Sequence, residues 1–272
     1  MNTGFGFSEI LMVVVLVVVF FGSKELPAFL REIARFTAKV RRYSDKIKRE
    51  LDDITRSADP QPVPFAEQQE KKKKLRAQCI DVRRNLGADA RAGKSAAITR
   101  TVLECAPVRD SVMIMLYAEM GAEVITRPLA GELIGRGKRV MLPYGIEGDS
   151  DLRFAEVFDT ERDILPGKHG VPEPREGLRK DFFRSDLQVI ICPGVAFDRQ
   201  GGRLGRGKGY YDRFLRELRG KVPFIGLAFD CQILAETLPF EYHDIPMDMV
   251  ITESGIIVGA PEAGNRENSL QG

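Results

Sequence analysis

The chain has 272 residues, enough for one large domain or two modest ones. It is 43% hydrophobic and 29% charged, as in ordinary globular proteins, and its net charge of +2 gives no electrostatic reason to expect a nucleic-acid partner. Its four cysteines form no C-x-x-C pair, and it has only two histidines. These counts disfavour a zinc site, a disulfide framework and a mechanism with several imidazoles.

Residues 10–21 form an unbroken run of twelve apolar residues. On an insertion scale such a run contributes roughly −4 to −7 kcal/mol, which exceeds the cost of at most about 3 kcal/mol for Glu9 at its edge. Residues 1–9 contain no Lys or Arg, so the basic region of a signal peptide is missing. We expect a single transmembrane helix that contacts the membrane over residues 8–22. A buried β-strand is the alternative, because seven of the twelve residues are β-branched.

The next segment predicts a basic amphipathic helix. Apolar residues recur every three or four positions from Leu26 to Ile54, and residues 24–49 contain nine Lys or Arg against three Asp or Glu. A basic helix directly after a membrane segment is typical of one that lies on an anionic leaflet. The positive-inside rule then puts this helix and the chain after it in the cytoplasm. The solvated face of a soluble helical hairpin is the alternative.

The sequence around the apolar run resembles a known membrane-protein family. Residues 7–11 read F-S-E-I-L and residues 21–27 read F-G-S-K-E-L-P. With the amphipathic helix, these segments are similar to the TatA/TatB subunits of the twin-arginine translocase over about residues 5–55. Ser23 departs from the proline that the family usually has. The resemblance implies a single-pass protein of the bacterial inner membrane, and it makes other Tat subunits candidate partners.

Three prolines within residues 60–64 cannot continue a helix and predict an extended linker. We therefore assign residues 1–56 to the two N-terminal helices, residues 57–66 to the linker and residues 67–260 to a globular domain. Residues 261–272 are polar and lack periodicity, which predicts a disordered tail.

Within residues 67–260, apolar strand-like runs alternate with helical patterns. This alternation predicts an α/β fold, a Rossmann-like three-layer sheet with helices on both faces. Ligands of such sheets bind at the carboxyl ends of the strands. The runs that predict strands are residues 112–117, 140–143, 189–192, 224–229 and 249–258.

A glycine-rich and basic segment follows the strand expected to end at Cys192. It has six glycines in residues 194–209, carries Arg203, Arg206 and Lys208, and leads into a helix predicted over residues 211–218. Glycines allow backbone N–H groups to turn toward an anion, so the segment predicts a phosphate-binding loop. A long basic turn is the alternative.

Two comparisons limit this prediction. The segment almost matches the P-loop pattern, but Gly209 stands where a P-loop has the Ser or Thr that binds magnesium, so we do not predict a P-loop protein. The letters G-R-G-K also occur at residues 135–138, between a helical pattern and a strand. There a helix C-cap and a turn explain them.

The same region resembles the 5-formyltetrahydrofolate cyclo-ligase family. Residues 193–198 read P-G-V-A-F-D and residues 203–212 read R-L-G-R-G-K-G-Y-Y-D, which is close to the signature of that family. The resemblance covers most of residues 71–258. It implies a catalytic domain in which ATP phosphorylates the N5-formyl oxygen of 5-formyltetrahydrofolate. Attack by N10 and loss of phosphate then give 5,10-methenyltetrahydrofolate.

Further motifs of the family follow in the same order. Lys72 and Arg76 match its K-x-x-L-R motif. Residues 123–126, E-V-I-T, match its E-V-D-T segment, with Ile125 in place of the usual acid. The remaining matches are residues 170–174, Gln232, residues 243–244 and residues 247–248.

The resemblance implies roles for individual residues. Catalysis is assigned to Arg206, Lys208 and Tyr210, and Mg2+ to Asp212 and Asp244. ATP is assigned to Lys72, Lys73, Lys74, Leu75, Arg76, Arg203, Leu204, Gly205, Arg206, Gly207, Lys208, Gly209, Tyr210 and Tyr211. The folate is assigned to Arg76, Ala118, Glu123, Arg206, Gly207, Lys208, Gly209 and Tyr210.

The residue types fit this chemistry, because phosphoryl transfer is catalysed mainly by positioning and positive charge. Lys72 and Arg76 are four residues apart and share one face of a predicted helix. The opposite, apolar face is expected to consist of Leu75, Cys79, Val82 and Leu86. Alternatives remain open: the lysines can form a solvated run, and Asp244 can be a turn residue before Pro246. His243 is expected to be structural.

A different class of function is a translocase subunit whose C-terminal domain is a non-catalytic interaction module. A degenerate enzyme would lose loop glycines or charged ligands first, and none of these is missing here. A nucleic-acid-binding loop is disfavoured because no aromatic residues alternate with its basic ones in a stacking platform.

Overall fold

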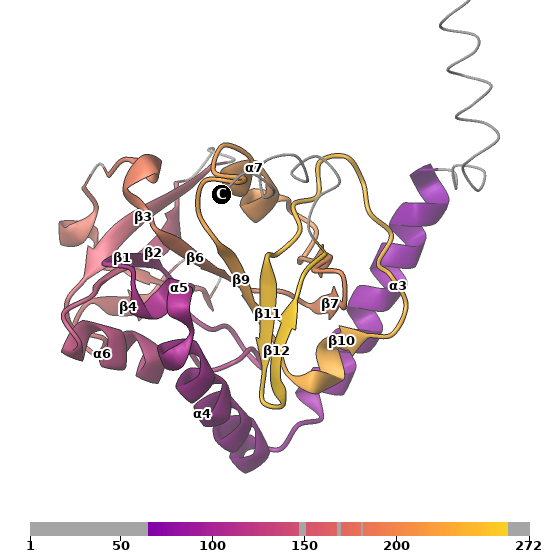
Figure 1. Ribbon diagram of the computed structural model, residues 1–272, viewed down its shortest axis with the longest axis horizontal. Helices are drawn as coiled ribbons and strands as arrows, with labels where there is room; N and C mark the ends of the chain where they lie inside the picture. The colour runs from indigo at the N-terminus through magenta and orange to yellow at the C-terminus, as the bar shows by residue number, and fades with distance from the viewer. Residues whose placement is uncertain (1–64, 147–150, 168–169, 181, 261–272) are drawn as a thin grey trace, which may run out of the picture. The chain divides into compact units, whose positions relative to one another are not determined.

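The computed structural model describes residues 65–146, 151–167, 170–180 and 182–260 (Figure 1). The chain divides into two compact units, Met1–Val63 and Pro64–Gly272. The predicted transmembrane helix, amphipathic helix and tail lie outside the described residues. None of the helices in the described part is long and apolar enough to cross a membrane. The first described helix begins at Phe65, two residues before the start that we predict for the domain.

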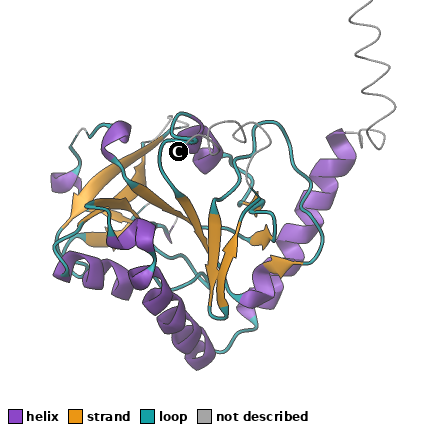
Figure 2. Ribbon diagram, viewed as in Figure 1, coloured by secondary structure: helices purple, strands orange, loops and turns teal. Residues whose placement is uncertain are grey.

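The centre of the second unit is a sheet of seven strands in the order β12-β11-β9-β6-β1-β2-β3 (Figure 1). Figure 2 shows the strands in orange and the helices in purple. The five inner strands are parallel, and the edge strands β3 and β12 are antiparallel to their neighbours. The strands are β1 (Met113–Met115), β2 (Arg139–Gly145), β3 (Leu152–Val157), β6 (Val189–Cys192), β9 (Phe224–Leu227), β11 (Met249–Thr252) and β12 (Gly255–Val258).

All five apolar runs contain a strand, which confirms the α/β class. The last run, residues 249–258, is not one strand: it turns at residues 253–254 into the hairpin β11–β12. Gly255 has a φ of 143°, a backbone conformation that residues with a side chain rarely adopt. The sheet is therefore mixed, because this turn reverses the chain at one edge and β3 pairs back on β2 at the other.

Alternate strand residues pack on opposite faces of the sheet. Ile114 belongs to one core with α4 (Ala88–Glu104), α5 (Ala106–Arg109) and α6 (Arg127–Gly135). Met115 belongs to the other core, which α7 (Tyr210–Arg216) covers together with loops. This alternation follows from the period of two in a β-strand. Helices thus lie on both faces, although the second face has only this one short helix among the described residues.

Helix α3 (Phe65–Arg84) lies beside a small sheet of three strands (Figure 1). Cys79 is buried and Leu75 partly buried against this sheet. Val82 is 47% exposed and Leu86 lies beyond the end of the helix, so our assignment of these two to the apolar face is wrong. The face that packs includes Ile80 instead. The small sheet comprises β10 (Ile233–Leu234), β7 (Ala196–Asp198) and β8 (Arg203–Leu204).

The remaining elements are short: β4, β5 and η2 lie near the β2–β3 edge of the central sheet, and η4 contacts α3. A two-stranded ribbon of β4 and β5 contacts β2 and β3. The three 3-10 helices in the described part of the chain are single turns. The bounds are β4 (Ile164–Pro166), β5 (Pro172–Pro174), η2 (Glu176–Leu178), η3 (Arg184–Asp186) and η4 (Asp230–Gln232).

The order of the parallel strands decides where a ligand site forms. From β1 the chain passes outward to β2, then returns to β6 on the other side of β1 and continues to β9 and β11. The winding therefore reverses between β1 and β6. In open α/β sheets, ligands bind in the crevice outside the carboxyl ends of the strands at this point.

Candidate active site

A cavity of about 510 Å3 lies at the carboxyl ends of β1, β2 and β6, where the winding reverses. A volume of this size suits a cofactor or a small-molecule substrate. Loops after these strands form its floor, α3 contributes one wall and the glycine-rich loop another. Its lining includes Gln69, Lys72, Arg76, Tyr117, Ala118, Glu123, Tyr144, Glu173, residues 193–195, residues 203–212, His243 and Asp244.

Most residues that the sequence assigns to the site line this one cavity, although they come from segments far apart in the chain. Three do not. Lys73 and Lys74 are exposed, and Leu75 packs against the small sheet. The reason is helical geometry: Lys72 and Arg76 are one turn apart on α3, whereas the residues between them rotate away from the cavity.

The glycines of the basic segment have two different structural roles, in a turn and in the cavity wall. Gly201 and Gly202 shape the turn between β7 and β8, where an added Cβ would come within 2.3 Å of the Met247 carbonyl oxygen or 2.4 Å of the Asp198 carboxylate. Gly207 and Gly209 have φ values of 97° and 65° and line the cavity. The glycines assigned to ATP, Gly205, Gly207 and Gly209, all line the cavity, whereas Gly201 and Gly202 do not.

Asp198 holds the β7–β8 turn in place. It is 1% exposed, and its carboxylate accepts hydrogen bonds from the backbone N–H groups of Gln200 at 2.9 Å, Gly202 at 2.7 Å and Leu238 at 2.8 Å. The turn therefore has a fixed conformation, and the loop that follows β8 starts from a rigid base.

The second G-R-G-K sequence is a helix end. Helix α6 stops at Gly135, and Gly137 has a φ of 74°. Lys138 donates hydrogen bonds to the carbonyl oxygens of Arg109 at 2.5 Å and Ser111 at 2.6 Å. It does not line the large cavity. The prediction of a C-cap and turn is confirmed.

The cations of the cavity differ in how strongly they are paired. Lys72 is 5% exposed, and its Nζ lies 2.6 Å from Asp244 Oδ2 and 3.0 Å from Glu241 Oε1. Arg203 bonds to Asp212 Oδ1 at 2.6 Å. Arg206 bonds to Glu123 Oε1 at 2.7 Å through one nitrogen and 3.2 Å through another. Buried cations need such partners because desolvation is costly.

Lys208 is the exception among these cations. It is exposed, lines the cavity, and has no hydrogen bond or ion pair with any described residue. Its charge is therefore available to an anion that enters the cavity.

The two carboxylates assigned to magnesium lie in the cavity wall, and each still has a free oxygen. Asp212 Oδ1 accepts from Arg203 and Asp244 Oδ2 from Lys72, whereas Asp212 Oδ2 and Asp244 Oδ1 accept from no described donor. The described residues contain no cluster of three or more His, Cys, Asp or Glu suited to a metal ion. Mg2+ commonly takes one or two carboxylates together with substrate phosphates and water, so this pair fits a magnesium ion that arrives with a nucleotide.

Comparison with known proteins identifies the domain. The model of the 5-formyltetrahydrofolate cyclo-ligase family matches residues 68–253. The chain belongs to this family. A 5-formyltetrahydrofolate cyclo-ligase from Escherichia coli K12 is 34% identical over 55% of this chain and 82% of its own. One from Mus musculus is 30% identical over 67% and 93%. The NMR structure of Aquifex aeolicus 5,10-methenyltetrahydrofolate synthetase has 30% identity and a TM-score of 0.61, covering 74% of this chain and 99% of its own.

A second comparison concerns the start of the chain. The model of the mttA/Hcf106 family matches residues 3–50. This match confirms the resemblance to the TatA/TatB family, and it falls outside the segment shared with the cyclo-ligases.

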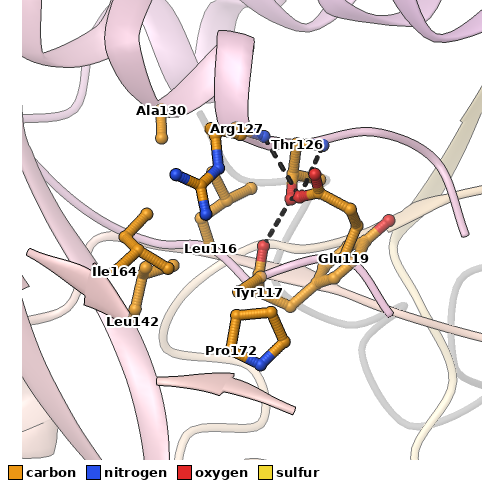
Figure 3. Close-up of a pocket in the computed structure, with 10 residues that line it drawn as sticks. Leu116, Tyr117, Glu119, Thr126, Arg127, Ala130, Leu142, Ile164 and Pro172 are labelled. Carbon is orange, nitrogen blue, oxygen red and sulfur yellow. Dashed lines mark hydrogen bonds between the residues drawn. The ribbon is translucent and has the colours of Figure 1, made fainter. Parts of the chain in front are cut away.

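In the cyclo-ligase domain, a small neighbouring cavity of about 20 Å3 shows how the loop after β1 is held (Figure 3). Glu119 accepts hydrogen bonds from the backbone N–H groups of Thr126 and Arg127 at 3.2 Å. The Thr126 hydroxyl has one proton to donate and lies within hydrogen-bond distance of two acceptors, the Tyr117 carbonyl oxygen at 2.7 Å and Glu119 Oε2 at 2.9 Å. These bonds cap α6 and fix the loop that carries Glu123. Ile125, which departs from the motif, lines neither cavity.

Two tyrosines give the cyclo-ligase cavity neutral hydroxyl groups. Burial, reinforced by nearby acidic groups, raises the pKa of Tyr117 and Tyr211 well above the ordinary value. Both therefore stay protonated at neutral pH and can donate a hydrogen bond. The Tyr211 hydroxyl is buried and has no hydrogen-bond partner among the described residues.

The cysteine thiols are not expected to take part in the chemistry. All four cysteines are free, and Cys79, Cys105 and Cys192 are buried. Burial raises the pKa of Cys192 to about 12, so this thiol remains protonated and does not act as a nucleophile at neutral pH.

Sequence reasoning missed Glu241, which organises the lysine side of the cavity. Its Oε1 accepts from Lys72 at 3.0 Å and from Gln69 Nε2 at 2.7 Å. Gln69 could have been predicted from the sequence, because residues three apart on a helix lie on the same face and Gln69 is three residues before Lys72 on α3. Glu241 has no such signal, because it meets Lys72 across a sequence separation of 169 residues that only the fold closes. His243, which we expected to be structural, lines the cavity, with its Nε2 3.2 Å from Glu241 Oε2.

Proposed function

We propose that residues 67–260 convert 5-formyltetrahydrofolate to 5,10-methenyltetrahydrofolate with ATP, releasing ADP and phosphate, in a chain anchored to the membrane by residues 8–22. One observation supports the enzymatic part above all others. The family's basic and acidic motifs, from α3, the β1 loop, the glycine-rich loop and residues 243–244, line a single cavity at the switch point of the sheet.

The proposed reaction has two steps. The formyl oxygen attacks the γ-phosphorus of ATP, and the bond from that phosphorus to the β–γ bridging oxygen breaks to release ADP. N10 then attacks the activated formyl carbon and loses its proton to solvent, while the carbon–oxygen bond breaks and phosphate leaves. Arg206 and Lys208 offset the charge of the transferred phosphoryl group, and the half-buried Tyr210 orients the substrate beside them.

Magnesium would be held by Asp212 and Asp244, through the oxygens that accept no hydrogen bond from a described residue; His243 Nε2 lies 3.9 Å from the one on Asp244. When bound there it would neutralise charge on the nucleotide phosphates. Lys72 and Arg203 hold the other oxygen of each carboxylate and so orient both groups before the nucleotide binds.

The function is tested by incubating the purified chain with its substrates. Formation of methenyltetrahydrofolate is monitored by the absorbance of this product. We expect turnover only when 5-formyltetrahydrofolate, ATP and a divalent cation are all present. Turnover without nucleotide, or no turnover with all three, would contradict the proposal. The second result would favour the alternative of a translocase subunit with a non-catalytic C-terminal domain.

Lys208→Ala should weaken ATP binding about tenfold or more, because a charge-assisted contact to a phosphate is lost from a residue that has no partner in the described part of the chain. Folate affinity should change less. Lys138→Ala is the matched control, since Lys138 ends the other G-R-G-K sequence and bonds only to carbonyl oxygens. Titration calorimetry with each ligand measures the effects. Equal losses in the two variants would show that the basic loop is not the nucleotide site.

The membrane proposal involves two forces, apolar burial and electrostatic attraction to lipids, and only the second is weakened by salt. The full-length chain should stay with membranes in high salt, because apolar burial of residues 10–21 is not screened. A chain shortened to begin at Lys24 should be released by salt, because a basic helix holds to lipids by attraction that decays within a Debye length. Fractionation and immunoblotting measure both. Release of the full-length chain by salt alone would contradict insertion.

The same proposal predicts orientation. The domain should resist a protease added outside intact spheroplasts, because the basic flank keeps it in the cytoplasm. Digestion from outside would reverse this assignment. We also propose that the N-terminal helices act together with other Tat subunits. The match of residues 3–50 to the mttA/Hcf106 family supports this part of the proposal.

A further inference from the structure

The large cavity has two chemically different ends. The strand order puts β6 and the basic loop on one side of β1, and β2 and β3 on the other. The first side carries Lys72, Arg76 and Lys208. The second is lined by Tyr144, Leu152 and Pro172, which are aromatic or apolar. A ligand with an anionic part and a flat ring system would therefore bind in one direction only.

The aromatic end contains one carboxylate that none of the assigned roles uses. Glu173 lies in β5 and lines the cavity, with its side chain 14% exposed. Its Oε2 accepts a hydrogen bond from Arg179 at 3.0 Å. Its Oε1 has only a long contact with the Gly145 N–H, at 3.4 Å. Each carboxylate oxygen can accept two hydrogen bonds, so both retain acceptor capacity toward the cavity.

The surroundings of Glu173 hold it in one position. An added Cβ on Gly167 would come within 2.7 Å of Glu173 Cγ and 2.8 Å of Cδ, so the backbone there packs directly on the side chain. Arg179 pairs with the carboxylate, and its guanidinium also lies 4.7 Å from the ring centroid of Tyr144. Carboxylate and ring are thus fixed relative to each other before a ligand binds, which lowers the entropy cost of binding.

The other glutamate of the cavity, Glu123, has more hydrogen bonds to the protein than Glu173 and lies elsewhere in the cavity. Glu123 Oε1 accepts two bonds from Arg206, and its Oε2 accepts one from the Met120 N–H. It lies between the two ends, in the loop after β1. A polar edge of a ring held at the aromatic end therefore meets Glu173 rather than Glu123.

We propose that Glu173 determines specificity for the pterin ring, by accepting hydrogen bonds from its N3–H and 2-amino groups. These adjacent donors match the two oxygens of a carboxylate, as the donors of a guanidinium do. The pyrimidine edge that carries them lies across the ring system from N5. Binding it at Glu173 directs the N5-formyl group toward the basic end, where ATP would bind. Arg179 is a positioning residue, since it holds both Glu173 and Tyr144. This assignment rests on the proposed function.

The test uses the full-length chain in detergent and titration calorimetry without nucleotide. The ligands are 5-formyltetrahydrofolate and its analogue in which hydrogen replaces the 2-amino group. The unaltered protein should bind the analogue about 10- to 100-fold more weakly than the substrate. Glu173→Gln should lose a similar factor for the substrate and little for the analogue, because the two changes remove the same interaction. Its affinity for ATP should stay within about twofold.

Glu156→Gln is the matched control. Glu156 also has a side chain 14% exposed and bonds to an arginine, Arg139, at 2.7 Å, but it does not line the cavity. Melting temperatures should fall by similar amounts in the two variants, while only Glu173→Gln loses folate affinity. Equal folate affinity in both variants would overturn the assignment. If Glu173→Gln lost equal affinity for the substrate and for the analogue, the assignment would also be overturned. Glu173 would then only support the structure of the cavity and would not contact the 2-amino group. An unaltered protein that fails to bind 5-formyltetrahydrofolate would overturn the proposed function, and this assignment with it.

Discussion

Lys72→Met is expected to lower kcat/KM for ATP by about 100-fold or more, the largest loss that we predict for a single residue outside the glycine-rich loop. Lys72 is buried in the cavity wall and contacts Asp244 and Glu241. Methionine keeps the length and apolar stem of the side chain but removes the charge. Two carboxylates would then face each other and the nucleotide phosphates without a cation, which repels the anionic substrate as well as removing a contact.

The control for this variant lies one residue away. Lys73 is exposed, and its only contact with a described residue is a 4.0 Å ion pair with the exposed Glu70. Lys73→Met should therefore leave kcat/KM within about twofold. Steady-state kinetics, with the formation of methenyltetrahydrofolate as the signal, measures kcat/KM for both variants. A Lys72→Met enzyme within about threefold of the unaltered protein would refute the assignment of this lysine to the nucleotide site.

Asp198→Ala should lower the free energy of unfolding by at least about 3 kcal/mol, because three backbone N–H groups lose their acceptor in a place without water. The hydrogen bonds to Gln200, Gly202 and Leu238 tie the β7–β8 turn to the segment after β10. Activity should fall as well, since the glycine-rich loop follows directly from this turn. The loss combines a cavity with unpaired polar groups, two of the mechanisms that produce large destabilisation.

Urea unfolding followed by circular dichroism measures this effect, with Asp81→Ala as control. Asp81 is exposed on α3, and no hydrogen bond or ion pair involves its side chain within the described residues. Its removal should change the free energy of unfolding by less than about 0.5 kcal/mol. A similar, small change in both variants would mean that the turn does not depend on the buried carboxylate.

Local sequence patterns were sufficient for the elements and the family. Each inner strand is a short apolar run between turn signals, and burial on both faces of a parallel sheet requires such runs. The spacing of Lys72 and Arg76 predicts a shared helix face, which holds because 3.6 residues make one turn wherever the helix lies. The family signatures are contiguous, so they could be recognised before any contact was known. The N-terminal match is of the same kind.

Only the tertiary structure decided how the residues combine. The glycines of one motif separated into Gly201 and Gly202, which shape a turn, and others that border the cavity. The Met247 carbonyl oxygen and the Asp198 side chain crowd the first pair. Glu241 meets Lys72 across a sequence separation of 169 residues, and Glu123 meets Arg206 across one of 83 residues. Such pairings depend on strand order and loop path rather than on local periodicity. The sequence by itself therefore determined the chemistry available to this protein, and the fold determined which charges are paired and which, such as that of Lys208, have no partner among the described residues.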